Sequence, residues 1–155
     1  MKKLVVLLVV ITTTCSIAMA QPRAIGVRLG YGAEASYQHS LGDNMLQADL
    51  GLFGWWGVEG AVTYNWIFPI NSWQKKGTWN WYAGVGGGGG FSWWGYGFVG
   101  AAGMIGVEYN FDFPLQLSVD YRPIIGPSFF YGGGVGFHTM GLWAGSIALG
   151  VRYKF

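Results

Sequence analysis

The chain has 155 residues, of which 10% are charged, and its formal net charge is +2. Two of its basic residues, Lys2 and Lys3, lie in a segment that we expect to be removed, and without them seven basic residues face seven acidic ones. A neutral chain with few charges is a poor nucleic-acid ligand, because phosphates are bound mainly by Lys and Arg. It also makes a poorly soluble surface for a cytosolic domain.

The N-terminus is typical of an exported protein. Lys2 and Lys3 precede a short apolar run, and residues 18–20 form a small-x-small cleavage site. The apolar run is too short for a membrane-spanning helix, which needs about 20 apolar residues. The sequence therefore predicts a secretory signal peptide over 1–20 and a single mature domain over 21–155.

Alternation of apolar and polar residues recurs through the mature chain, and this period of two predicts β-strands. Glycine is abundant at 28 residues and the aromatic fraction is 18%, which also favours closely spaced strands. A sheet in lipid must close on itself, because an open edge would leave backbone groups unpaired. We therefore expect an all-β fold, an eight-stranded antiparallel up-and-down transmembrane β-barrel. The predicted strands are 24–30, 33–40, 45–53, 57–68, 78–86, 98–111, 115–122 and 141–155.

The connections between these strands fall into two sets. Residues 41–44, 69–77 and 110–114 would lie at the periplasmic end together with the C-terminus. The outer connections would be 31–32, 54–57, 87–95 and 123–140, of which all but the last are short.

The last predicted strand carries the clearest signal. Its apolar face holds Trp143 and ends in Tyr153 and Phe155, whereas the opposite face is small or charged. An apolar face with aromatics at its end is typical of a strand between lipid and a polar interior. The pair Tyr153 and Phe155 also resembles the signal by which Gram-negative bacteria assemble outer-membrane barrels, which implies the barrel assembly machinery as a partner.

Every charged residue in the predicted strands lies on the face opposite the apolar one. Chance would achieve this roughly once in 500 trials if each charge chose between two faces. A charge facing lipid costs about 2–4 kcal/mol near the midplane, whereas a soluble barrel would show the reverse arrangement. We expect an interior ion-pair network, since eight strands enclose only enough space for their own side chains; a polar path for ions or a small ligand is the alternative. The predicted network comprises Arg28, Glu34, Asp49, Glu59, Glu108, Asp120, Arg122, Arg152 and Lys154.

Aromatic residues gather near both predicted membrane boundaries, as amphipathic rings do at the headgroup region. They predict contact with outer-membrane lipids and lipopolysaccharide, and a binding role for the outer group is an alternative. The periplasmic girdle would contain Trp66, Trp79, Trp81 and Tyr109, and the outer girdle Trp55, Trp56, Trp93, Trp94, Tyr121 and Trp143.

The sequence predicts no catalytic, cofactor or metal site. A GxGxxG pattern at 84–89 is not followed by a helix, which nucleotide binding would require. The single cysteine, Cys15, lies in the expected signal peptide. A lipid hydrolase would need a Ser–His–acid arrangement near the outer leaflet; His39 lies at the opposite end, and His138, with Ser128 nearby in sequence, is the alternative that stays open.

The mature chain resembles a family of small single-domain outer-membrane β-barrel proteins of Gram-negative bacteria. The resemblance implies the barrel fold and a location in the cell outer membrane after passage through the periplasm, and it implies no particular activity. We expect a monomer with a non-enzymatic structural role in the envelope; a narrow channel for small or hydrophobic compounds and, less favoured, an outer-leaflet lipid hydrolase are the alternatives. The matching stretches are 32–39, 79–86, 105–111, 114–123 and 148–155.

Overall fold

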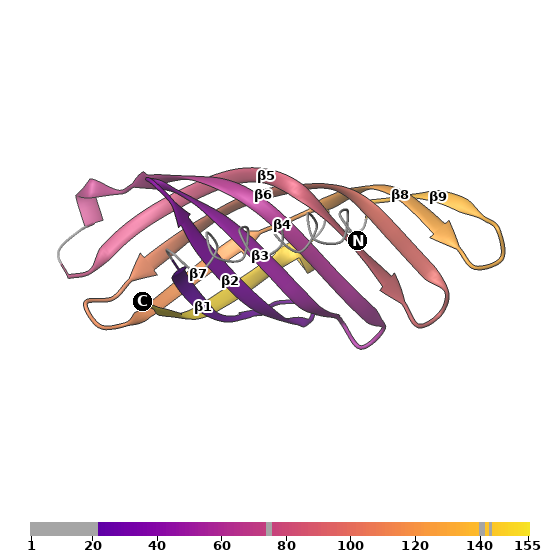
Figure 1. Ribbon diagram of the computed structural model, residues 1–155, viewed down its shortest axis with the longest axis horizontal. Coiled ribbons are helices and arrows are strands. Elements are labelled where there is room, and N and C mark those ends of the chain that lie inside the picture. Colours follow the sequence, from indigo (N-terminus) through magenta and orange to yellow (C-terminus); the bar gives the residue numbers. More distant parts are fainter. Residues whose placement is uncertain (1–21, 74–75, 140–141, 143) are drawn as a thin grey trace, which may run out of the picture.

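The computed structural model describes residues 22–73, 76–139, 142 and 144–155 (Figure 1). The predicted signal peptide over 1–20 and Trp143 of the predicted outer girdle lie outside these residues. No helix in the described ranges is long and apolar enough to cross a membrane. The elements are β1 (Pro22–Leu29), β2 (Ala33–Leu41), β3 (Asn44–Phe53), β4 (Gly57–Pro69), η1 (Asn71–Trp73), β5 (Thr78–Ser92), β6 (Tyr96–Asn110), β7 (Leu115–Tyr121), β8 (Ile124–Phe130), β9 (Val135–His138), η3 (Ala144–Ser146) and β10 (Ile147–Lys154).

Eight of the strands close into an antiparallel barrel. Each strand from β1 to β6 pairs with the next in sequence, and β10 pairs with both β7 and β1. This closure confirms the predicted eight-stranded up-and-down fold. The chain leaves the barrel where it entered, because the Phe155 amide donates to the Arg23 carbonyl at 3.2 Å. We call this the terminal end of the barrel.

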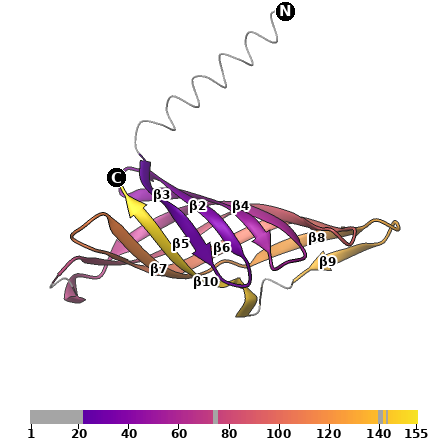
Figure 2. The same ribbon diagram turned by 90° about the horizontal axis from the view of Figure 1, so that it is seen from below.

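The two remaining strands form a hairpin at the opposite end, which we call the hairpin end (Figures 1 and 2). The sequence predicted a loop over 123–140, which was wrong. Strand β7 pairs with β6 only as far as Ile105, so the first part of β6 would present an open edge. Strand β8 covers that edge, from Ala102 paired with Ile124 to Tyr96 paired with Phe130, and an exposed edge is a liability that proteins cover.

The start predicted for the last strand was also wrong. Strand β10 begins at Ile147 rather than at 141, and the one-turn helix η3 precedes it. The alternation continues back beyond Ile147 in the sequence, but the barrel partner does not, because β7 ends at Tyr121 opposite Ile147. Pairing therefore sets the strand end that alternation alone could not place.

The glycine run in β5 is strand rather than connection. The sequence predicted an outer connection over 87–95, but pairing continues to Ser92 on both sides, and the turn takes only residues 93–95 and ends in Gly95, which has a φ of 79°. Glycine is usually a strand breaker. Here two neighbouring strands hold it in place, and a Cβ at Gly86 would lie 1.9 Å from the Val62 carbonyl oxygen.

We expect Gly86→Ala to lower the free energy of unfolding by about 1–3 kcal/mol, the usual cost of forcing extra atoms into a packed site. Gly87→Ala is the matched control, because a Cβ at Gly87 finds its nearest neighbour at 3.7 Å and should change stability by less than about 0.5 kcal/mol. Urea unfolding of both variants measures the difference. Equal stability of the two would contradict the close strand approach at Gly86.

The barrel interior is mostly polar, with two small apolar clusters around Phe98 and Met45, and the outer surface is apolar. Gln38, Gln47 and Gln116 are fully buried in the interior, while Val119 on the outer surface is 54% exposed. The alternation of each strand places the two kinds of side chain on opposite faces. The exposed outer residues between the two ends include Ile25, Val27, Leu50, Val62, Val85, Val99, Ile105 and Leu149.

Candidate functional site

An ion-pair cluster centred on Arg122 lies inside the barrel towards the hairpin end. The guanidinium of Arg122 donates from Nη2 to Glu34 Oε1 at 2.6 Å and to Glu59 Oε1 at 2.7 Å. Its Nη1 donates to Asp49 Oδ2 at 3.2 Å. Arg122 follows β7 directly, so one side chain bonds carboxylates from β2, β3 and β4 across the barrel. Charge-assisted bonds of this kind are about twice as strong as neutral ones.

Arg28 forms the second centre of the same cluster. Its Nε donates to Asp120 Oδ1 at 2.6 Å and its Nη1 to Glu34 Oε2 at 2.9 Å. Nη2 donates to the Ser146 carbonyl at 3.0 Å. Glu34 therefore bridges the two guanidinium groups. We call Arg28, Glu34, Asp49, Glu59, Asp120 and Arg122 the hairpin-end cluster.

Arg152 lies next to this cluster and is bound by hydroxyl groups. Its Nε donates to Ser36 Oγ at 2.9 Å and its Nη1 to Ser118 Oγ at 2.7 Å. Ser36 in turn donates to Asp49 Oδ1 at 2.5 Å, so Arg152 is linked to the cluster through one hydroxyl. Among the described residues Arg152 forms no direct ion pair.

Tyr82 fills the space that Gly106 leaves in the barrel interior. A Cβ at Gly106 would lie 2.6 Å from the Tyr82 ring and hydroxyl. The Tyr82 hydroxyl donates to Asp120 Oδ2 at 3.1 Å, and the residue is fully buried. An inward glycine thus accommodates a neighbouring ring rather than an empty path.

A second polar cluster, around Glu108, lies towards the terminal end. Glu108 is fully buried and accepts from Arg23 Nη1 at 3.0 Å, from Asn80 at 2.9 Å and from Gln116 at 3.1 Å. Arg23 is not among the predicted network residues, because the predicted strand begins at Ala24 and its alternation, carried back one residue, would place Arg23 on the outer face. The pairing of β1 with β2 shifts register between Pro22 and Ala24. A β-bulge reverses the side-chain direction locally, and the only signal for it was that Glu108 lacked a basic partner.

The nine predicted network residues thus occupy four places. Six form the hairpin-end cluster, Arg152 lies beside it, and Glu108 belongs to the terminal-end cluster. Lys154 is half-buried at the terminal rim, where its Nζ donates to the Phe111 carbonyl at 2.7 Å. Among the residues that the structure describes, Lys154 therefore has a backbone partner and forms no ion pair with a carboxylate.

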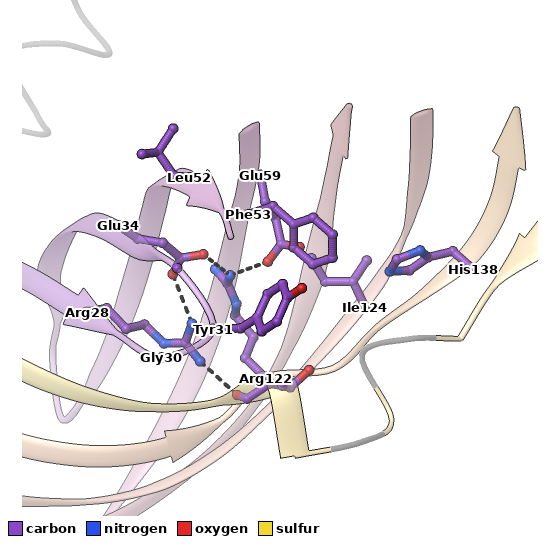
Figure 3. A pocket seen from close by; sticks show the side chains of 13 residues that line it. Arg28, Gly30, Tyr31, Glu34, Leu52, Phe53, Glu59, Arg122, Ile124 and His138 are labelled. Atoms are coloured by element: carbon purple, nitrogen blue, oxygen red, sulfur yellow. Dashed lines mark hydrogen bonds and ion pairs between the residues drawn. The ribbon is translucent and has the colours of Figure 1, made fainter. Parts of the chain in front are cut away.

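A cavity of about 290 Å³ opens above the hairpin-end cluster, and we call it the mouth cavity (Figure 3). Its floor is charged, with Arg28, Glu34, Glu59 and Arg122 at the surface. Its walls are mostly apolar and come from the β1–β2 turn, the end of β3, and strands β8 and β9. The wall residues include Tyr31, Leu52, Phe53, Ile124 and His138.

His138 is part of this wall and is held by aromatic partners. Its ring stacks on Phe98 at a centroid distance of 3.7 Å and an angle of 3°. Its Nδ1 shares a hydrogen bond of 2.6 Å with the Tyr96 hydroxyl. The hydroxyl at His138 is thus a phenol rather than the serine that the hydrolase alternative requires. His39 lies on β2 near the terminal end, and its Nδ1 shares a hydrogen bond of 3.2 Å with the Tyr37 hydroxyl.

The predicted girdle residues gather at the two ends of the barrel. At the terminal end Phe68 stacks on Trp81 at 4.3 Å, and Trp79 contacts Tyr109 at 4.7 Å. At the hairpin end the ring centroids of Trp56 and Trp94 lie 6.3 Å apart. Trp66, Tyr153 and Phe155 also lie at the terminal end, and Trp55, Trp93 and Tyr121 towards the hairpin end.

Comparisons with protein-family models, with curated proteins and with solved structures found no match. In the part of the chain that the structure describes, no group of three or more His, Cys, Asp and Glu side chains is arranged to hold a metal ion. The mouth cavity and the charged clusters are therefore interpreted from their own geometry.

Proposed function

We propose that the protein is an integral barrel of the Gram-negative outer membrane with a non-enzymatic, structural role in the envelope. The single observation that carries this proposal is the distribution of side chains, which is mostly polar inside and apolar outside. In water such a barrel would expose a continuous apolar belt, which soluble monomers avoid. In a bilayer the same belt contacts lipid, and the charges remain inside.

The two aromatic clusters support the orientation. They border the apolar belt at both ends, where Trp and Tyr rings favour the headgroup region. The outer girdle, with Trp55 and Trp94 strongly exposed, would contact lipopolysaccharide at the hairpin end. The terminal end then faces the periplasm.

The two chain termini would carry the signals for export and for insertion into the outer membrane. Residues 1–20 would direct export and then be removed. Tyr153 and Phe155 are exposed at the terminal end and contact each other at a centroid distance of 5.5 Å, so the barrel assembly machinery could recognise them as a pair. The domain over 21–155 would then work as a monomer.

The filled interior favours a structural role over a channel. Tyr82, Arg152, Gln116 and Glu108 are almost completely buried between the mouth cavity and the terminal end. Arg152, Gln116 and Glu108 each make several hydrogen bonds, so an ion would have to break them to pass. The mouth cavity is the feature that keeps a narrow channel as the second candidate.

Expression of the full chain in a Gram-negative host tests the proposal. We expect the processed protein in the outer-membrane fraction, with different gel mobility before and after boiling, and no single-channel conductance in planar bilayers. Recovery in the soluble periplasmic fraction without a mobility shift would contradict the membrane assignment. Reproducible single-channel conductance would contradict the structural role and support the narrow channel instead.

A further inference from the structure

The mouth cavity combines an apolar wall with a charged floor, and nothing in the structural role requires such a space. Ligand sites are typically concave, mostly apolar and furnished with a few fixed polar groups, with volumes from about 300 Å³ upwards. At about 290 Å³ the mouth cavity lies at the lower end of that range. It fits one small molecule rather than a polymer.

The wall suits the apolar part of such a molecule. The ring centroids of Tyr31 and Phe53 lie 5.5 Å apart. These two rings face the cavity from one side, while Ile124 and His138 face it from the other (Figure 3). Aromatic faces also attract cations, by about 0.5–2 kcal/mol depending on exposure. An organic group with a positive charge is therefore compatible with the rings as well as with the floor.

The floor has a charge imbalance. The hairpin-end cluster and the linked Arg152 contain three guanidinium groups and four carboxylates. Each nitrogen of the Arg28 guanidinium already donates one hydrogen bond, to Asp120, to Glu34 and to a backbone carbonyl. Both Nη atoms of Arg122 bond carboxylates, while Arg122 Nε and Arg152 Nη2, which have no partner among the described residues, are buried. Because the carboxylates outnumber the guanidinium groups by one, an anion would add to the excess negative charge, whereas a single cation would balance the floor.

Glu59 is the carboxylate best placed to meet that cation. Its Oε1 accepts from Arg122, and no bond to its Oε2 occurs among the described residues. Its side chain is 13% exposed, against 7% for Glu34 and 1% for Asp49. Since Glu59 also lines the cavity, it offers one carboxylate oxygen to an incoming group.

From this geometry we infer that the mouth cavity binds a small organic monocation, an ammonium group carried on an apolar or aromatic body. The ammonium donates to Glu59 and completes the charge of the floor, while the body packs between Tyr31, Phe53 and Ile124. The excess negative charge of the floor disfavours anions. The apolar wall favours cations that carry an apolar group over small inorganic ions.

Titration of the full-length barrel, purified from membranes into detergent, tests this inference with three probes of one shape. Phenethylammonium is the cation, 2-phenylethanol the neutral analogue and phenylacetate the anion. Calorimetry and the chemical shift of the Ile124 methyl groups follow binding. We expect saturable binding of phenethylammonium only, with Ile124 shifting in step.

Glu59→Gln should weaken phenethylammonium binding roughly tenfold, since a hydrogen bond to a charged group is lost. Asp43→Asn is the matched control; Asp43 is an exposed acid in the β2–β3 turn at the far end of the barrel, and its loss should leave binding unchanged. The heat-dependent gel shift verifies that both variants are folded.

Three outcomes would overturn the inference. The first is equal binding of the neutral or anionic probe, and the second is unchanged affinity in Glu59→Gln. The third is a shift confined to outer-surface residues, which reports partitioning into detergent rather than binding in the cavity.

Discussion

Replacing Arg122 with alanine should be among the most damaging single changes in this barrel. Arg122 neutralises Glu34, Asp49 and Glu59 at once, and its side chain is 1% exposed. Removing one partner of a buried ion pair leaves uncompensated charge and costs about 3–5 kcal/mol. Urea unfolding in lipid vesicles, followed by tryptophan fluorescence, measures the loss.

The matched control restores neutrality without restoring the ion pairs. Arg122→Met combined with Glu34→Gln, Asp49→Asn and Glu59→Gln removes the charges together, and such replacements are often neutral or stabilising. We expect the combined variant to recover much of the stability that Arg122→Ala loses. If Arg122→Ala is as stable as the parent protein, the cluster does not hold the barrel together.

Placing a charge on the outer surface should be nearly as costly, provided that the surface contacts lipid. Val119 lies in the middle of the apolar belt, between Leu149 on β10 and Val107 on β6. Val119→Arg should lower the free energy of unfolding in a bilayer by about 2–4 kcal/mol. The same urea titration in vesicles reports the change.

The control for this change uses a position that the proposed bilayer does not cover. Tyr131 lies in the β8–β9 turn and is 96% exposed, so Tyr131→Arg should alter stability by less than about 0.5 kcal/mol. In water both substitutions would be ordinary surface changes. Equal effects of Val119→Arg and Tyr131→Arg would therefore contradict a lipid-covered belt.

The barrel could be predicted from sequence because every strand repeats one constraint. Apolar and polar residues must alternate when one face of a strand meets the interior and the other meets its surroundings. Arg28, Glu34 and Asp120 obey this rule on three different strands, and the structure brings them together through Arg28. The sequence placed them on one face, and closure of the barrel turned that face into a cluster.

Local departures from regular pairing could not be predicted in this way. Arg23 reaches Glu108 only because a β-bulge reverses its direction, and the bulge leaves no trace in the alternation. The β8–β9 hairpin follows from the uncovered edge of β6, which depends on the relative lengths of neighbouring strands.

The mouth cavity could not be predicted from the sequence either, because it depends on how distant segments pack. Its wall joins Tyr31 from the β1–β2 turn with His138 from β9, segments that are more than 100 residues apart in the chain. Only the position of the hairpin brings His138 over the charged floor. The sequence could indicate a polar interior, but not where packing would leave space.

The contact between the outer surface and lipid is the central claim, and spin labelling of single cysteines tests it most directly. Because Cys15, the only cysteine in the chain, lies in the signal peptide that we propose is removed, a label on the mature protein attaches only at the introduced cysteine, in Val119→Cys or in Tyr131→Cys. In membrane-reconstituted protein we predict that the Val119 label collides with oxygen dissolved in lipid and is protected from a water-soluble nickel chelate, whereas the Tyr131 label is open to the chelate. A Val119 label that the chelate reaches as freely as the Tyr131 label would contradict the account.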